Sequence, residues 1–270
     1  MKNIQSNIVN YKCNISLDIV NKYNILSISS FIKYPAVDII IWNNNEVFKE
    51  EYFCKFPNLK MLINWGTATS NLPCLSQFLK RSIRVKTMKG YSTNAVSEYI
   101  IYTLMKLLAR SKPVRKELYG KKIGIIGMGN VGLHVTKLLK GFNCDISYYS
   151  QAKKNINIPF ISLDELVKKS EAIVIAVDSK DFRVPLEFLK EAQKGLVICN
   201  ISQDFILPAF EVIDSVNNRI IPDIDIISDN FTTKEVLKNY SAYYSPHIAY
   251  KSIESSVQKN NMLEDFIALL

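Results

Sequence analysis

The sequence predicts an α/β protein in which a doubly wound parallel sheet is inserted into a second, smaller α/β domain. Three observations lead to this prediction. From residue 120 onward, short and almost wholly apolar runs alternate with helix-like stretches, a pattern typical of a parallel sheet covered on both faces. The first of these runs leads directly into a glycine-rich turn. Residues 1–90 carry a separate set of apolar runs, which predicts a second sheet.

The larger domain is predicted to span residues 91–250. Its expected strands are the apolar runs at residues 122–127, 144–150, 172–177, 195–201 and 219–224. The expected helices between them cover residues 131–142, 162–170, 185–194 and 208–218. Residues 94–110 should form a further helix. Its apolar residues run nearly all round, so we expect it to be buried, with a subunit contact as one way of burying it.

The smaller domain is predicted to combine residues 1–90 with residues 251–270. Its expected strands are residues 36–42, 58–65 and 83–89, with a helix over residues 45–56. The final stretch, residues 252–270, reads as another helix that returns to pack on this domain.

The composition is that of an ordinary globular protein, with 270 residues, 48% hydrophobic and 22% charged. The five cysteines are scattered without a C-x-x-C pair, and only two histidines accompany them. Reduced thiols, no zinc or other metal site and a cytoplasmic location are therefore expected. The polar N-terminus predicts no signal peptide. No stretch approaches the ~18 apolar residues of a membrane span.

The net charge of +9 has two interpretations. It could serve a nucleic acid or an acidic membrane, or it could reflect a lysine-rich, solvated surface. The basic residues are spread along the chain as pairs, and no motif that combines basic and aromatic residues accompanies them. We favour the solvated surface, and expect a small-molecule partner rather than nucleic acid or membrane.

The glycine-rich turn carries the pattern G-x-G-x-x-G at Gly127, Gly129 and Gly132. The pattern alone is weak, but here it follows a predicted strand and precedes a predicted helix, which is the context of a Rossmann-type dinucleotide site. The first glycine permits the tight turn, the second admits a pyrophosphate, and the third allows close packing of helix on strand. The helix N-terminus then offers free N–H groups to the phosphates. The alternative is a tight turn without a ligand.

The end of the second strand bears on the choice between NAD and NADP. Sites for NAD usually have an acidic residue about 20 residues after the motif begins, which binds the ribose 2′-hydroxyl. Here Ser150 ends the strand, and Lys153 and Lys154 follow it. Without a carboxylate to repel a 2′-phosphate, and with two cations nearby, the sequence favours NADP over NAD. The alternative is that these lysines belong to a surface loop.

Several blocks of the chain resemble the D-isomer-specific 2-hydroxyacid dehydrogenase family, across roughly residues 58–255. They are "GYSTNAVSEYIIYTLMKLLAR", "KKIGIIGMGNVGLHVTKLLKGFNCDISYY", "KGLVICNISQDF", "IIPDIDI" and "SPHIA". The resemblance implies a substrate domain, a dinucleotide domain and a homodimer built on the larger domain. It also implies hydride transfer between nicotinamide and the C2 carbon of a 2-oxo acid, served by a histidine, a glutamate and an arginine.

The catalytic positions that the resemblance implies are only partly kept. His247 in "SPHIA" matches the proton-donating histidine. The arginine that pairs with the substrate carboxylate is replaced by Gln203, and the glycine that normally follows it by Asp204. The position of the glutamate falls at Ser228, so that its neighbour Asp229 substitutes only after a shift of one residue. The loop that relatives use for the carboxylate reads "WGTATSN".

The residues expected to bind the cofactor follow from the motif and the resemblance together. Asp223 matches an aspartate that in relatives lies beside the nicotinamide ring. The full expected set is Gly127, Gly129, Asn130, Val131, Gly132, Ser150, Lys153, Asn200 and Asp223.

The function predicted is an NAD(P)-dependent oxidoreductase that resembles D-2-hydroxyacid dehydrogenases but acts on a carbonyl substrate other than a simple 2-oxo acid. His247 would donate the proton and Gln203 would hydrogen-bond a neutral group. The alternative is a catalytically impaired dinucleotide-binding protein with a regulatory or accessory role. A nucleic-acid binder is a third hypothesis, motivated by charge alone.

Overall fold

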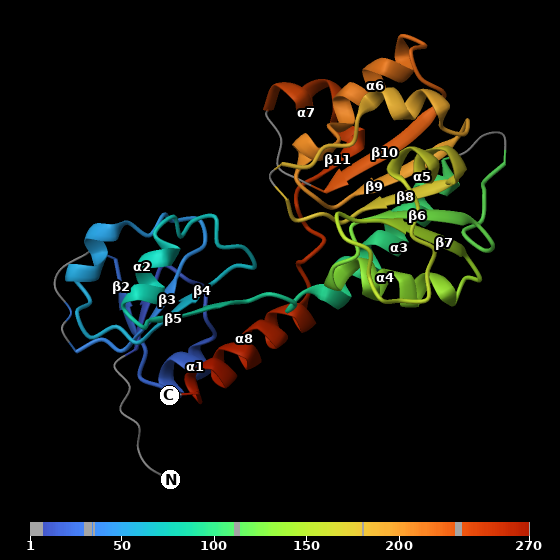
Figure 1. Ribbon diagram of the computed structural model, residues 1–270. Helices are drawn as coiled ribbons and strands as arrows, with labels where there is room; N and C mark the ends of the chain where they lie inside the picture. Colours follow the sequence, from blue (N-terminus) through green and yellow to red (C-terminus); the bar gives the residue numbers. More distant parts are fainter. Residues whose placement is uncertain are drawn as a thin grey trace. The chain divides into compact units, whose positions relative to one another are not determined.

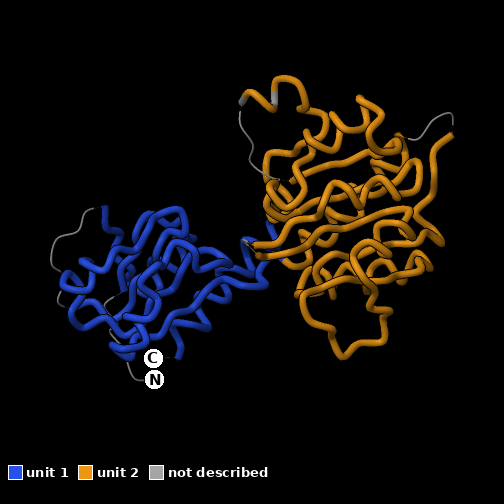
Figure 2. The backbone as a smooth tube through the Cα atoms, turned by 45° about the horizontal axis from the view of Figure 1, so that its top comes forward, with its two compact units in different colours: residues 1–92, 253–270 blue, residues 93–252 orange. Residues whose placement is uncertain are grey.

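The computed structural model describes residues 8–29, 34, 36–110, 114–179, 181–229 and 234–269. It divides into two compact units, shown in blue and orange in Figure 2. Unit 1 comprises residues 1–92 and 253–270, and unit 2 comprises residues 93–252. The sequence predicts these divisions after residues 90 and 250. Unit 2 is thus inserted in unit 1, and the predicted fold class is confirmed.

Unit 1 is built on a five-stranded parallel sheet with the order β2-β1-β3-β4-β5. The strands are β1 (Ile8–Tyr11), β2 (Leu26–Ile28), β3 (Ile39–Trp42), β4 (Met61–Asn64) and β5 (Arg84–Thr87). The helices are α1 (Leu17–Lys22), η1 (Glu50–Cys54), α2 (Leu75–Lys80) and α8 (Ile253–Ile267).

Both faces of this sheet are covered. In β3, Ile39 and Ile41 face a core that includes residues of α1 and α8, while Ile40 and Trp42 face a core with residues of η1 and α2. All four of these side chains are fully buried. Burial on both faces explains why the strand is an unbroken apolar run.

Unit 2 is built on a six-stranded parallel sheet with the order β11-β10-β9-β8-β6-β7. The strands are β6 (Lys122–Ile126), β7 (Asp145–Tyr149), β8 (Ala172–Ile175), β9 (Leu196–Asn200), β10 (Ile224–Asp229) and β11 (Tyr244–Ser245). An isolated bridge from Phe160 to Tyr148 extends the sheet beyond β7. If the bridge is counted as a strand and the strands are numbered along the chain from β6, the order across the sheet is 3-2-1-4-5-6, followed by β11. This is the doubly wound order of a dinucleotide-binding domain.

Helices cover both faces of the second sheet (Figure 1). They are α3 (Thr93–Ala109), α4 (Asn130–Lys140), α5 (Leu163–Lys169), η2 (Leu186–Glu191), η3 (Asp204–Ile206), α6 (Ala209–Asn217), α7 (Lys234–Tyr240) and η4 (Ser241–Tyr243). Helices α3 and α4 share one core with the sheet, whereas α5, η2 and α6 share the other. No helix in the described part of the chain is long and apolar enough to cross a membrane.

Some predicted elements differ from the structure. The helices expected over residues 45–56 and 185–194 are short 3₁₀ segments, η1 and η2. Position 270 of the predicted last helix lies outside the described residues. The strand expected over residues 219–224 begins only at Ile224. Residues 219–221 instead close the end of α6, because the N–H groups of Ile220 and Ile221 donate to the Ser215 carbonyl and Arg219 adopts a left-handed φ of 59°.

Candidate active site

The glycine-rich turn lies where the sheet of unit 2 changes direction. The chain passes from β6 to β7 on one side of β6 and later returns as β8 on its other side. In open α/β sheets, ligands bind outside the carboxyl ends of the strands at such a switch point. Because every strand in this sheet is parallel to its neighbours, the carboxyl ends of all six meet at this same edge.

The three glycines differ in what an added side chain would contact. Gly127 has a φ of 100°, and a Cβ atom there would lie 2.3 Å from the Ala176 carbonyl oxygen. A Cβ at Gly132 would lie 2.1 Å from the Gly127 carbonyl oxygen, so α4 packs directly on the turn. A Cβ at Gly129 would meet no atom within 4 Å. Packing therefore excludes side chains at the first and third positions, while the second faces open space.

The N-terminus of α4 presents unsatisfied donors to that open space. Gly129 is the N-cap and supplies no side-chain cap. The first helical hydrogen bond runs from the Leu133 N–H to the Gly129 carbonyl, at 2.9 Å. The N–H groups of Asn130, Val131 and Gly132 precede that bond, at the positive end of the helix dipole. This arrangement fits a pyrophosphate, which would fill the space over Gly129 and accept from these groups.

The loop after β7 lies at the next strand end. The Ser150 hydroxyl donates to the Ala152 carbonyl at 2.6 Å, and the Lys154 N–H donates to the buried hydroxyl of Tyr148 at 2.7 Å. These bonds fold the loop back onto the strand, leaving Lys153 and Lys154 exposed. The strand thus ends in a hydroxyl followed by two cations, at the position where NAD sites carry a carboxylate.

Three aromatic side chains lie beside this loop. The Tyr149 ring stacks on Phe182 with a centroid distance of 6.0 Å and on Phe160 with a centroid distance of 6.4 Å. Phe160 is 38% exposed. A flat, partly exposed aromatic surface suits the adenine ring of a dinucleotide. Sequence reasoning missed it because the three residues come from three segments, and only the sheet aligns them.

Asn200 is expected to bind the cofactor, but its side-chain amide forms hydrogen bonds to the protein backbone. It is fully buried, accepts from the Ser202 N–H at 2.9 Å and donates to the Leu207 carbonyl at 3.4 Å. The Ser202 hydroxyl in turn accepts from the Val177 N–H at 2.7 Å. The Asn200 amide therefore shapes the loops after β8 and β9.

His247 and Asp229 come together at the same carboxyl edge. Asp229 ends β10, is 2% exposed, and its carboxylate accepts the N–H groups of Ile248 and Ala249, each at 2.9 Å. The His247 Nδ1 lies 3.2 Å from the Asp229 carbonyl oxygen and 3.9 Å from Oδ2 of its carboxylate. His247 has a φ of 53°, a left-handed conformation rare outside glycine and often found at functional sites. Asp229 thus holds the loop that carries the histidine.

Two hydroxyl groups that sequence reasoning missed extend this contact. The Ser245 hydroxyl, in β11, donates to the Asp229 carboxylate, and the Tyr99 hydroxyl, in α3, donates to the Ser245 oxygen at 2.8 Å. Partial burial raises the pKa of Tyr99 above its usual range, so its hydroxyl keeps its proton. The chain Tyr99–Ser245–Asp229 orients the carboxylate beneath the histidine loop.

Gln203 and Asp204 follow β9 at this edge. Gln203 is exposed, whereas the Asp204 carboxylate turns inward and accepts from the hydroxyls of Ser228 at 3.2 Å and Tyr244 at 3.3 Å. Partial burial raises the pKa of Asp204. The neutral amide of Gln203 is therefore exposed, whereas the carboxylate of Asp204 is hydrogen-bonded to β10 and β11.

The assignment of Asp223 to the cofactor site is corrected by the structure. Asp223 precedes β10, and its carbonyl accepts from the Gly195 N–H before the start of β9. It therefore lies at the amino edge of a parallel sheet, while Gly127 lies at the carboxyl edge. The error follows from the strand register, because the strand was predicted to end at residue 224 and instead begins there.

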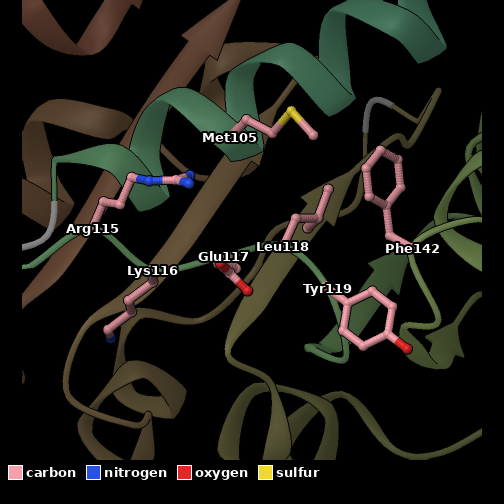
Figure 3. A pocket seen from close by; sticks show the side chains of 7 residues that line it. All are labelled: Met105, Arg115, Lys116, Glu117, Leu118, Tyr119 and Phe142. Atoms are coloured by element: carbon pink, nitrogen blue, oxygen red, sulfur yellow. The ribbon is translucent and has the colours of Figure 1, made fainter.

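A cavity of about 250 Å³ also lies outside this site (Figure 3). It is lined by residues 115–119, Met105 and Phe142. Residues 115–119 come before β6 and Phe142 before β7. These residues precede their strands, so the cavity belongs to the amino edge of the sheet and not to the carboxyl edge.

Known proteins resemble this chain in sequence. The family described as "D-isomer specific 2-hydroxyacid dehydrogenase, NAD binding domain" matches residues 95–249. The chain is 24% identical over 256 residues to a glyoxylate reductase of Pyrococcus furiosus, covering 83% of this chain and 76% of that protein. It is 25% identical over 189 residues to a hydroxypyruvate reductase of Thermotoga maritima, covering 63% of this chain and 61% of that protein.

Solved structures share the fold. An NADPH-dependent glyoxylate/hydroxypyruvate reductase of Sinorhizobium meliloti, solved with citrate, superposes with a TM-score of 0.80 at 16% identity, covering 97% of this chain and 94% of that one. An acyclic imino acid reductase, solved with NADPH and D-Arg, superposes with a TM-score of 0.79 at 19% identity, covering 97% of each chain. The chain therefore belongs to the D-isomer specific 2-hydroxyacid dehydrogenase family, whose members are NAD(P)-dependent dehydrogenases and reductases.

Proposed function

We propose that this protein uses a reduced nicotinamide cofactor to reduce the carbonyl group of a small substrate other than a simple 2-oxo acid. The observation that carries the proposal is the arrangement of His247 and Asp229 at the carboxyl edge that also holds the glycine turn. A fixed imidazole supplies the proton that carbonyl reduction requires.

The geometry at His247 assigns its two ring nitrogens to different tasks. A proton on Nδ1 donates to the Asp229 carbonyl at 3.2 Å, which leaves Nε2 to give its proton to the substrate oxygen. The hydroxyls of Ser245 and Tyr99 hold the Asp229 carboxylate in place. When bound, the nicotinamide supplies the hydride. The groups of this chain supply the proton and the orientation.

The substrate class follows from Gln203. An amide cannot form the charge-assisted, bidentate pair that a guanidinium makes with a carboxylate. Such a contact contributes about 1.5–3 kcal/mol, so its loss weakens binding or turnover of a 2-oxo acid about tenfold or more. A substrate with a neutral hydrogen-bonding group beside its carbonyl suits the exposed amide better.

The cofactor proposed is NADP in preference to NAD. Ser150 places no negative charge at the end of β7, and Lys153 is exposed in the loop that follows. The backbone N–H groups of Asn130, Val131 and Gly132 would hold the pyrophosphate, and the rings of Tyr149 and Phe160 would lie against the adenine.

A homodimer built on unit 2 completes the proposal. Helix α3 buries one side against the sheet and α4, yet Tyr102 is 58% exposed and Met105 43% exposed. These two side chains form an apolar strip that a second copy of the helix would cover.

The test is steady-state reduction of a panel of carbonyl compounds with NADPH and NADH. The panel contains glyoxylate, hydroxypyruvate and uncharged 2-oxo amides or esters. We expect the uncharged compounds to give the higher kcat/KM, and His247→Gln to lower kcat at least a hundredfold while leaving NADPH affinity unchanged. Gln203→Arg should raise kcat/KM for glyoxylate.

The competing hypothesis is a dinucleotide-binding protein without catalysis, in a regulatory or accessory role. It predicts calorimetric binding of NADPH with no turnover of any compound in the panel, and no gain of activity in Gln203→Arg. Those two results together would reject the oxidoreductase.

A further inference from the structure

A second cavity lies at the amino edge of the unit 1 sheet. Its volume is about 400 Å³, which falls within the range of about 300–1,000 Å³ that is typical of small-molecule sites. Leu59 and Ile83 line it and come just before β4 and β5. Every residue of its lining belongs to unit 1, so the cavity is complete within that unit.

The buried part of this lining is apolar and firmly packed. Phe53 and Phe56 belong to it, and both are buried side chains of the unit 1 core. The Phe53 ring packs on Phe48 with a centroid distance of 5.3 Å and on Phe78 with a centroid distance of 4.8 Å. Because these contacts fix the ring before any ligand arrives, a ligand that lies against it pays little in ordering the protein.

The exposed part of the lining carries charges of both signs, on Glu50, Glu51 and Arg81. The Arg81 guanidinium lies over the Phe53 ring, 4.7 Å from its centroid, so the cation is held against the apolar part. Within the described residues, no carboxylate lies at ion-pairing distance from Arg81, and no cation lies at that distance from Glu50. Glu51 pairs with Lys49 at 3.8 Å. Arg81 and Glu50 therefore have no ion-pair partner to lose when a ligand binds.

This combination of groups matches a zwitterion with an apolar body. A guanidinium binds a carboxylate through two parallel hydrogen bonds, and a glutamate accepts hydrogen bonds from an ammonium group. The phenylalanine rings offer apolar area to a side chain. A ligand with only a negative charge would be repelled by the two glutamates, and one with only a positive charge would be repelled by Arg81.

We propose that this cavity binds a free α-amino acid with a large apolar side chain. The Arg81 guanidinium pairs with the α-carboxylate, Glu50 accepts from the ammonium group, and the side chain lies against Phe53 and Phe56. The proposal does not rest on the carbonyl reduction proposed above, because none of these residues takes part in that reaction.

Calorimetry with L-phenylalanine and two analogues tests the site. Phenethylamine lacks the carboxylate, and 3-phenylpropionate lacks the ammonium group. We expect the protein to bind L-phenylalanine and to bind each analogue about tenfold more weakly, because each loses one charge-assisted contact. Arg81→Met and Glu50→Gln should each weaken binding of L-phenylalanine to a similar extent. Arg84→Met is the matched control, since the Arg84 guanidinium donates to the Leu269 carbonyl at 3.2 Å and does not line the cavity.

The thiol of Cys54 reports where the ligand binds. It lines the cavity and is exposed, whereas Cys13 and Cys199 are buried. L-Phenylalanine at about ten times its Kd should slow alkylation of Cys54 by iodoacetamide about tenfold, as measured by mass spectrometry of the peptide that contains it. The same concentration should give little protection in Arg81→Met.

His247→Gln should change neither the binding nor the protection, so that failure of the proposed reductase and failure of this site give different results. Absence of L-phenylalanine binding, equal binding of both analogues, or undiminished binding by a folded Arg81→Met would each overturn the proposal. Binding that leaves Cys54 unprotected and is lost in His247→Gln would place the amino acid at the candidate active site and reject this cavity. If Arg81→Met does not fold, the analogues and the protection of Cys54 in the wild type decide it.

Discussion

The substitution Gly129→Ala tests whether the glycine turn binds a pyrophosphate, because it should block the ligand without changing how the turn folds. The backbone at Gly129 has φ −87° and ψ −160°, an extended conformation open to alanine. A Cβ there meets no protein atom within 4 Å. The substitution therefore changes only what can approach the N-terminus of α4.

Two small effects on stability oppose each other at this position. Replacing glycine by alanine restricts the unfolded chain and stabilises the fold by about 0.4–1 kcal/mol. Alanine is a poorer N-cap than glycine, which offsets much of that gain. The free energy of unfolding should thus stay within about 1 kcal/mol of the wild type.

Cofactor affinity should respond very differently. The added methyl group occupies the space in which a pyrophosphate would approach the N–H groups of Asn130 to Gly132. Loss of one hydrogen bond to a charged phosphate costs about 1.5–3 kcal/mol, which corresponds to about a 10- to 100-fold weaker Kd.

Gly132→Ala is the matched control, since its Cβ would lie 2.1 Å from the Gly127 carbonyl oxygen. Overpacking of this kind costs about 1–3 kcal/mol of stability. Thermal unfolding without ligand and calorimetric titration with NADPH measure both quantities for both variants. Wild-type NADPH affinity in Gly129→Ala would refute the placement of the pyrophosphate, and a large loss of Tm in that variant would refute the claim of open space.

Three further predictions follow from other parts of the molecule. Ser150→Asp should weaken NADPH binding at least tenfold relative to NADH binding, because a carboxylate at the end of β7 repels a 2′-phosphate. Fluorescence titration with both cofactors measures the ratio of the two Kd values, and an unchanged ratio contradicts the prediction. Tyr102→Asp should convert the proposed dimer to a monomer by charging its apolar strip, and light scattering that shows one mass for both proteins contradicts the interface. Burial lowers the pKa of Lys259 in α8 to about 8, below that of an unfolded lysine, ~10.4. The unfolded chain therefore holds more protons between these values, and the wild type should gain stability relative to Lys259→Met as pH rises from 8 to 10. Urea unfolding at both pH values measures this, and the opposite trend rejects it.

Several features of the site could be predicted from the sequence because they are local. Gly127, Gly129 and Gly132 lie within six residues, and their spacing between an apolar run and a helix-like stretch can be read from the sequence. Ser150 could be placed because it directly follows an apolar run. His247 stood out because only two histidines occur in the chain and one follows a proline.

The register of β10 could not be predicted in the same way. Residues 219–224 contain three isoleucines, which favours a strand, but the hydrogen bonds that close α6 take the first two of them. The strand then starts five residues later than expected, which moves Asp229 to the carboxyl edge and Asp223 to the amino edge.

The sequence by itself determined the alternation of strands and helices, the place of the glycine-rich turn and the family, because these depend on side-chain periodicity and on the spacing of residues within short segments. The tertiary structure alone decided the hydrogen bonds of Ser245 to Asp229 and of Tyr99 to Ser245, and that of Lys259 to the Trp65 carbonyl. These partners are distant in the chain, and contacts near 3 Å form only when packed strands and helices bring them to one edge. The periodicity of apolar residues along the chain does not predict which distant residues this packing brings into contact.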